Sequence, residues 1–256
     1  MESHWEPLGP NLKVLVSPNH SFNTDTLLLA HFSMPAAGQR CADLGTGCGT
    51  IPLLWCARGR PRQVLALELQ KEGVGLAKRS AEENGFSQTL QVIQGDLREY
   101  KALLPHQGLD LMSCNPPYFP GGWGAKGKHP ERAAARHEET MTLEDLCQAA
   151  RFSLTFGGRL CFCLPVERLA EAAALCRGTG LEPKRLRLVQ LREDRPPYLF
   201  LMECRRGGKP GLAGEPTLLL RQEDGNWSRE MREIYGDYQE GTKKNPAAKT
   251  AEKPSC

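Results

Sequence analysis

The sequence lacks the long apolar segments that a membrane protein needs. Its 256 residues contain no apolar run of about eighteen, and no basic-then-apolar leader follows Met1, so we expect neither a membrane span nor a secretory signal. Metal-binding spacing is also missing, because the ten cysteines are scattered and no Cys-x-x-Cys pair is accompanied by a second pair or by a histidine pair. We therefore expect a cytoplasmic protein with reduced thiols and no bound metal.

The glycine-rich segment 45–50 lacks two signatures of phosphate binding. There is no Gly-Lys-Ser/Thr sequence, and Thr50 stands where the fingerprint Gly-x-Gly-x-x-Gly has its third glycine. The segment joins an expected strand (40–44) to an apolar helix (51–57), the layout of a nucleotide site at the edge of a parallel sheet. A glycine turn without a phosphate cradle fits S-adenosylmethionine, which has no pyrophosphate, better than a nicotinamide cofactor. Cys48 is interpreted as a small loop residue and not as a nucleophile.

Acidic residues follow two further expected strands. Strand 63–67 ends in Glu68, at the distance downstream where an acid accepts ribose hydroxyls, and strand 90–94 leads to Asp96, which could accept from an adenine amino group. Taken singly, each acid is better explained as an ordinary loop carboxylate. Their order along successive strands predicts a single cofactor pocket. Its residues are expected to be Asp43, Gly45, Thr46, Gly47, Glu68, Asp96 and Asn115.

The tetrapeptide Asn115-Pro116-Pro117-Tyr118 follows the apolar run 109–114. The Asn115 amide oxygen and the Pro116 carbonyl can both accept hydrogen bonds from an –NH2 group. The two prolines restrict the backbone, and the Tyr118 ring offers a face for a flat base or amide. On its own the tetrapeptide also fits a strand-to-turn cap. After the cofactor motifs, it predicts catalytic residues Asn115, Pro116 and Tyr118, which would act by positioning an amino group, since no general base is evident.

This order of motifs resembles the class I S-adenosylmethionine-dependent methyltransferases, and the tetrapeptide resembles their amino-methylating branch. The flanking segments resemble the bacterial tRNA (adenine-N6)-methyltransferases over roughly residues 12–238. The resemblance implies S-adenosylmethionine as cofactor, adenine N6 in tRNA as target, and Thr24 on the substrate side. The flanking segments are Asn23-Thr24-Asp25-Thr26-Leu27-Leu28-Leu29-Ala30, Ala135-Arg136-His137-Glu138, Leu143-Glu144-Asp145-Leu146, Asp224-Gly225-Asn226-Trp227-Ser228 and Ile234-Tyr235.

The residues alone leave the substrate open. A protein glutamine methyltransferase of the release-factor type is the main alternative, because an amide –NH2 presents the same hydrogens to the tetrapeptide. A ribosomal RNA guanine or a DNA adenine would also fit, as would a methyltransferase-like scaffold without activity. RNA is favoured by the glycine-rich loop after Tyr118, although a solvated basic face explains the loop equally well. The loop residues predicted to bind substrate are Trp123, Lys126, Lys128, Arg132 and Arg136.

A second basic cluster, residues 184–195, is interpreted as a solvated face. The net charge of +3 is modest, and much of it lies in the lysine-rich end of the chain. Residues 239–256 are poor in apolar groups and are predicted to be a disordered basic tail. Residues 1–238 are predicted to form one methyltransferase domain, acting as a monomer, with a substrate-side N-terminal segment (1–38).

Strands and helices alternate as βαβ units require. Helices are expected at 71–84, 143–154 and 167–177, and Gly157-Gly158 is expected to end the second of these before a strand at 159–164. The expected fold is α/β, a doubly wound, seven-stranded and mostly parallel sheet of the Rossmann-like methyltransferase type. A late antiparallel hairpin is predicted, and the strand order is taken from the resemblance. The hairpin strands are 185–191 and 198–204.

Overall fold

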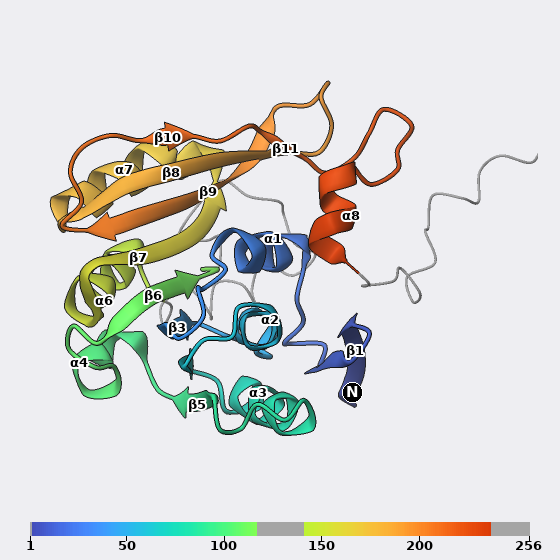
Figure 1. Cartoon of the computed structure of the whole chain (residues 1–256), viewed down its shortest axis with the longest axis vertical. Helices are drawn as coiled ribbons and strands as arrows, with labels where there is room; N and C mark the ends of the chain where they lie inside the picture. The colour runs from blue at the N-terminus through green and yellow to red at the C-terminus, as the bar shows by residue number, and fades with distance from the viewer. Residues whose placement is uncertain (1, 117–140, 237–256) are drawn as a thin grey trace, which may run out of the picture.

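A mixed β-sheet crosses the molecule and carries helices on both faces (Figure 1). The computed structural model describes residues 2–116 and 141–236. The strand order is β10-β8-β9-β7-β6-β3-β4-β5, and β11 also pairs with β8. The seven long strands are β3 (Arg40–Leu44), β4 (Gln63–Glu68), β5 (Leu90–Gln94), β6 (Leu109–Cys114), β7 (Leu154–Pro165), β8 (Leu181–Gln190) and β9 (Pro197–Arg206).

The order of the parallel strands reverses at β3, which pairs with β4 on one side and β6 on the other. In this register Leu44 lies opposite Leu67 on β4 and opposite Cys114 on β6. The carboxyl ends of these three strands therefore meet at one edge of the sheet, where open α/β sheets bind their ligands. The prediction of a doubly wound, mostly parallel sheet is confirmed.

The other half of the sheet contains the antiparallel pairs. β9 pairs with both β7 and β8, so the predicted late hairpin is confirmed. The sheet has nine strands where seven were expected, because β10 (Ala213–Gly214) and β11 (Leu218–Leu219) add parallel to β8. Two-residue strands show no alternation of apolar residues, so the sequence gives no signal for them.

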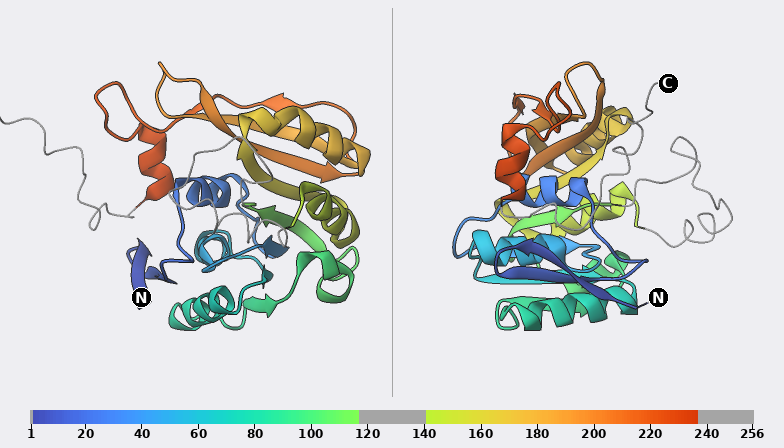
Figure 2. Two further views of the ribbon diagram at one scale, coloured as in Figure 1. Left: turned by 180° about the vertical axis from the view of Figure 1, so that it is seen from behind. Right: turned by 90° about the vertical axis from the view of Figure 1, so that its right-hand side faces the viewer.

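Side chains alternate along the strands between the two faces of the sheet, and they pack into two separate hydrophobic cores. On β3, Cys41 packs into the core shared with α1, α2 and α3, whereas Ala42 and Leu44 pack into the core shared with α6 and α7. Seen from behind in Figure 2, α6 and α7 lie in front of the strands. The helices are α1 (Thr24–Phe32), α2 (Thr50–Arg58), α3 (Lys71–Glu83), α4 (Tyr100–Leu103), α6 (Leu143–Ser153), α7 (Leu169–Gly178) and α8 (Arg229–Tyr235), with 3₁₀ turns η1 (Leu97–Glu99) and η2 (Val166–Arg168).

The expectation that Gly157-Gly158 ends α6 is wrong. The helix ends at Ser153, and both glycines lie inside β7. Between two pairings with β6 the strand β7 advances five residues while β6 advances two, from Leu109 opposite Leu154 to Leu111 opposite Arg159. Gly157 has a φ of 80° in this bulge, so a glycine is needed there for strand geometry and not for a helix cap.

An N-terminal hairpin, β1 (His4–Gly9) with β2 (Leu12–Val16), precedes the sheet and was not predicted. The backbone N–H groups of β2 that face α3 donate to side chains on this helix and at its end, where another strand would otherwise accept them. The Lys13 N–H donates to Asn84 Oδ1 (3.1 Å), and the Leu15 N–H donates to Ser80 Oγ (2.9 Å). The first part of the predicted substrate-side segment therefore packs on α3, and the segment reaches the sheet edge only at the start of α1.

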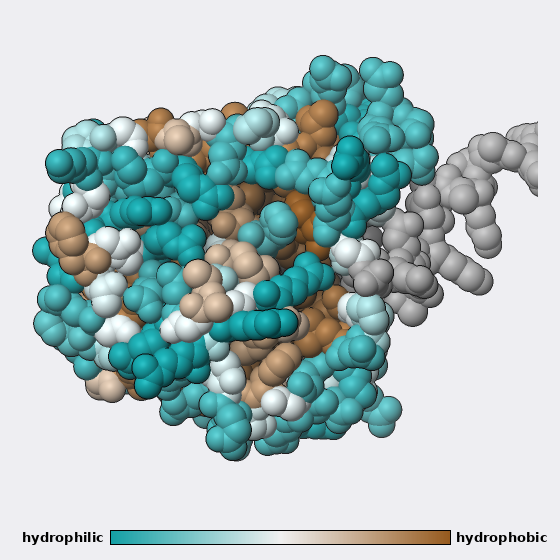
Figure 3. Space-filling model, viewed as in Figure 1, coloured by the Kyte–Doolittle hydropathy of each residue, from teal (hydrophilic) through white to brown (hydrophobic). Residues whose placement is uncertain are grey.

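Helix α8 closes the fold against α1 and β8. The Arg187 guanidinium pairs with both carboxylate oxygens of Glu230 (2.5 and 2.7 Å), and Arg58 donates to the carbonyl of Ile234 (3.1 Å). The hydroxyls of Tyr235 and Thr24 lie 3.1 Å apart. Beside α8, Figure 3 shows apolar residues in a hollow of an otherwise hydrophilic face, where a narrow pocket is lined by residues of β1, α1, α2 and α8.

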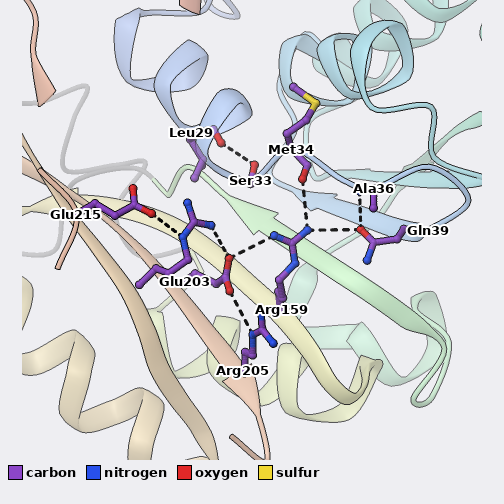
Figure 4. Close-up of polar contacts among 10 residues, drawn as sticks. Leu29, Ser33, Met34, Ala36, Gln39, Arg159, Glu203, Arg205 and Glu215 are labelled. Atoms are coloured by element: carbon purple, nitrogen blue, oxygen red, sulfur yellow. Dashed lines mark hydrogen bonds and ion pairs between the residues drawn. The ribbon is translucent and has the colours of Figure 1, made fainter. Parts of the chain in front are cut away.

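A buried carboxylate joins β7, β8 and β9 (Figure 4). Glu203 is 1% exposed and accepts from Arg185 (2.8 Å) and Arg159 (3.3 Å), with Arg205 at 3.4 Å. Arg185 also pairs with Glu215 (2.7 Å). All four arginines of the basic cluster 184–195 are therefore engaged in ion pairs, Arg185 here, Arg187 with Glu230 of α8, and Arg192 and Arg195 with Asp194.

The nine cysteines of the described part of the chain are free and buried, as expected for reduced thiols. Over the same residues, no helix combines the length and the apolar content that a bilayer crossing requires.

Candidate active site

The predicted cofactor residues meet at the carboxyl edge of β3, β4 and β5. A small pocket opens there, beside the glycine turn that follows β3. Two of the predicted residues, Gly45 and Asp96, contribute to its wall. The described residues that line the pocket are Gly45, Leu67, Leu69, Gly95, Asp96, Leu97 and Met141.

The glycine turn is held in place by β4. Gly45 and Gly47 have positive φ values of 69° and 57°, a conformation that favours glycine. The N–H groups of Gly45 and Thr46 donate to the Leu67 carbonyl (2.9 and 3.0 Å), and the Gly47 N–H donates to Glu68 (2.8 Å). These donors are therefore engaged within the protein, which explains why the turn suits a ligand without pyrophosphate.

Cys48, the other residue of interest in the turn, is 3% exposed. Burial raises the pKa of its thiol above the ordinary value. Its sulfur is 3.3 Å from the Thr50 hydroxyl. This environment agrees with the interpretation of Cys48 as a small packing residue, because a reactive cysteine needs a lowered pKa and access to solvent.

The two strand-end acids, Glu68 and Asp96, differ in the hydrogen bonds and ion pairs that their carboxylates already make within the protein. Glu68 is 7% exposed and accepts the Gly47 N–H and the Gln70 N–H, both at 2.8 Å, which leaves further lone pairs on both oxygens. Asp96 caps η1 and is clamped by the Arg98 guanidinium. Arg98 holds the pKa of Asp96 below its usual range, so this carboxyl stays ionised.

Asp43 lies below the turn and not on the pocket surface. It is 1% exposed and accepts a hydrogen bond from the hydroxyl of Ser113, which lies opposite it on the neighbouring strand β6. Burial raises the pKa of Asp43 to about 7, although the Ser113 hydrogen bond opposes the shift. The carboxyl supports the glycine turn from beneath.

We expect Asp43 to make stability fall with rising pH. Between an unfolded pKa of about 4 and a folded pKa of about 7, the folded state holds a proton that the unfolded state has lost. The resulting loss, up to about 4 kcal/mol, should be absent from Asp43→Asn. Urea unfolding at pH 5 and pH 8 should show the variant gaining stability relative to the natural protein at the higher pH. A constant difference between them would contradict the assignment.

Asn115 is held between two elements that are distant in sequence. Its Nδ2 donates to the Thr26 hydroxyl on α1 (3.1 Å), and the Cys163 thiol of β7 donates to its Oδ1 (3.2 Å). Asn23 caps α1, accepting from the Thr26 N–H (3.0 Å) and from the Thr26 hydroxyl (2.9 Å). Next to them on α1, Asp25 accepts from the Tyr198 hydroxyl (3.0 Å).

Sequence reasoning selected Thr24 from this helix, and the structure places Thr24 against Tyr235 and Thr26 against Asn115. It did not select Thr26 or Cys163. Thr26 lies in the flanking segment 23–30 but has no role assigned by it, Cys163 stands in no motif, and both reach Asn115 only through the fold. The remaining predicted residues lie outside the described residues, namely Tyr118, Trp123, Lys126, Lys128, Arg132 and Arg136.

A doubly wound sheet with a glycine turn, strand-end acids and an Asn-Pro sequence at one edge defines a class I S-adenosylmethionine-dependent methyltransferase. Residues 23–167, more than half of the chain, match the family model for the methyltransferase small domain. The chain belongs to this family.

Named relatives cover most of the chain. A protein of Tolumonas auensis named tRNA1(Val) (adenine(37)-N6)-methyltransferase is 31% identical over 216 residues, 84% of this chain and 88% of its own length. A protein of the same name from Shewanella sp. (strain MR-4) is 29% identical over 221 residues, 84% of this chain and 90% of its own. The match therefore extends well beyond the motifs, over most of both chains.

Solved structures agree on the fold. The crystal structure of a predicted O-methyltransferase from Agrobacterium tumefaciens has a TM-score of 0.67 at 22% identity, covering 84% of this chain and 97% of its own. A geranyl diphosphate methyltransferase in complex with S-adenosylmethionine has a TM-score of 0.52 at 12% identity, covering 70% of this chain and 82% of its own.

The residues at the sheet edge fit S-adenosylmethionine. A Cβ added at Gly45 or Gly47 would meet no atom within 4 Å, so the backbone of the turn faces open space. Glu68 offers carboxylate acceptors for hydroxyls beside it, and the apolar pocket next to Asp96 suits a flat ring. Once bound there, S-adenosylmethionine supplies an electrophilic methyl group on a sulfonium.

Proposed function

We propose that the protein methylates the N6 amino group of an adenine in tRNA. The observation that carries the proposal is the Asn115 amide, which is held directly after β6, beside the end of β3 where the glycine turn begins, and is followed by Pro116. The names of the relatives support tRNA as the substrate and adenine N6 as the target. Free buried thiols further support a cytoplasmic enzyme, and we propose that it acts as a monomer without a metal.

In this proposal the protein acts by placing the amino group. The lone pair of an exocyclic amine is delocalised into its ring, which makes the nitrogen a weak nucleophile. Hydrogen bonds from the two N–H groups to Asn115 Oδ1 and to the Pro116 carbonyl favour a pyramidal nitrogen and aim its lone pair at the methyl carbon. Bound S-adenosylmethionine would supply the methyl group and would leave as S-adenosylhomocysteine, and the proton lost by the methylated amine would pass to solvent.

Glu68 is proposed to bind the ribose hydroxyls of the cofactor. We expect Glu68→Ala to weaken binding of S-adenosylhomocysteine about 10–100-fold, as for hydrogen bonds to a charged acceptor. The loss also frees the Gly47 N–H, which loosens the turn. Isothermal titration calorimetry measures the change, with the exposed Glu72→Ala as a matched control that should bind normally. Equal affinity in the two variants would remove Glu68 from the site.

The substrate is tested with the purified protein and labelled S-adenosylmethionine. The expected result is label in unmodified tRNA transcripts, recovered by mass spectrometry of nucleosides as N6-methyladenosine. Label in a release-factor peptide and not in tRNA would replace the proposal by glutamine methylation. Binding of NADH without S-adenosylhomocysteine would overturn the cofactor assignment as well.

A further inference from the structure

We propose that Thr26 and Cys163 are positioning residues that fix which end of the Asn115 amide faces the substrate. Both contact Asn115 from elements outside its own strand, one from the first turn of α1 and the other from the core of β7. The inference rests on the proposed role of Asn115 and extends it to two residues to which the sequence motifs assign no role.

The direction of the hydrogen bonds follows from a single unambiguous donor. The backbone N–H of Thr26 can only donate, so the Asn23 atom that receives it, at 3.0 Å, is the side-chain oxygen. That oxygen can only accept, so the Thr26 hydroxyl at 2.9 Å must donate to it. The single hydroxyl proton of Thr26 is then committed.

A committed hydroxyl can act toward Asn115 only as an acceptor. The Asn115 atom at 3.1 Å from Thr26 Oγ1 is therefore the –NH2 group. The carbonyl end of the amide must point the other way, where the Cys163 thiol lies at 3.2 Å. The helix cap of α1 thus sets the orientation of a side chain at the end of β6.

The Cys163 contact suits an oxygen that must also serve a substrate. A carbonyl oxygen has two lone pairs, and a thiol is a weak donor. Cys163 is 0% exposed, so water does not compete for the contact. The thiol therefore stabilises the carbonyl end of the amide in this position without competing strongly with a substrate N–H. Reversal of the amide would instead place its –NH2 group against the incoming amine.

The test compares variants that keep or remove each polar group. Thr26→Val keeps the shape but removes the acceptor, and we expect kcat to fall about 10-fold, the effect of one oriented hydrogen bond. Thr26→Ser should restore kcat. Cys163→Ala should lower kcat and Cys163→Ser should retain it, with the KM for tRNA and the affinity for S-adenosylhomocysteine unchanged in all four. Thr179→Val, which removes a threonine hydroxyl at the end of α7, is the matched control and should be fully active.

Two further measurements separate positioning from general damage. In an Asn115→Ala background, Thr26→Val should add no further loss of kcat, because the group it positions is gone. The side-chain amide NMR signals of Asn115, assigned by their absence in Asn115→Ala, should shift in Thr26→Val and not in Thr26→Ser. This readout needs no turnover, so it tests the inference even if tRNA proves not to be the substrate. Full kcat together with unmoved amide signals in Thr26→Val would overturn it.

Discussion

Replacing Asn115 with alanine should reduce methyl transfer to tRNA about 100–1000-fold, the range for losing one preorganised hydrogen bond in an active site. The amide is half-buried and fixed from two sides, so its oxygen is oriented before substrate arrives. The cofactor contacts proposed for the glycine turn and Glu68 are untouched by the change. The measurement is single-turnover transfer of a labelled methyl group, paired with calorimetry of S-adenosylhomocysteine.

The control for this variant is Asn19→Ala, the same change at an exposed asparagine whose side-chain amide donates to the exposed Glu72. It should keep full activity. Normal cofactor affinity with lost turnover in Asn115→Ala supports a positioning role. Unchanged turnover would exclude Asn115 from the chemistry.

Replacing Glu203 with alanine should lower the free energy of unfolding by about 3 kcal/mol, the lower part of the range for breaking a buried ion pair. The lower part applies because Arg185 keeps a third of its side chain in contact with water. The variant leaves Arg159 and Arg185 facing a cavity in place of a carboxylate (Figure 4). Urea unfolding measures the loss, and Glu215→Ala, which breaks a pair at the rim, should cost less than about 1 kcal/mol. Equal losses in the two variants would contradict this ranking.

The same carboxylate should make the protein sensitive to acid. Burial tends to raise the pKa of Glu203, but hydrogen bonding from Arg185 and the charge of Arg159 outweigh it and hold the pKa below its usual range. Its contribution is therefore complete above the unfolded pKa of about 4.3 and is lost as the pH falls through the lower folded value. Glu203→Gln should lack this acid-dependent loss, which unfolding curves at pH 3 and pH 6 would reveal.

The parallel half of the sheet was predictable because its signals are local. Each strand is a short apolar run, and the turn after β3 needs glycine at positions where φ is positive. The N-terminal hairpin was not predictable in the same way, because the partners of β2 on α3 are the polar side chains of Ser80 and Asn84. The prediction that Gly157 ends α6 was wrong for a related reason, because a glycine shortly after a helix fits a helix cap and a β-bulge equally well.

The residues of the site also differ in whether a local sequence signal or only the fold reveals them. Gly45, Glu68 and Asn115 could be selected because each stands at a strand end in a fixed order. The burial of Asp43 could not be foreseen, since a strand-end carboxylate looks the same in sequence whether it faces the pocket or the core. Cys163 is a buried core residue, and its contact with Asn115 arises from the neighbouring positions of β6 and β7 in the sheet.

The contact between Thr24 and Tyr235 joins residues that are 211 positions apart. A ribosome releases α1 well before α8. While the residues between them are synthesised, α1 therefore lacks its contact with α8. Until residue 235 has left the exit tunnel, a nascent chain holds Thr24 without the Tyr235 hydroxyl and Arg58 without the Ile234 carbonyl. Assembly of this side of the enzyme therefore cannot be completed before α8 has left the exit tunnel.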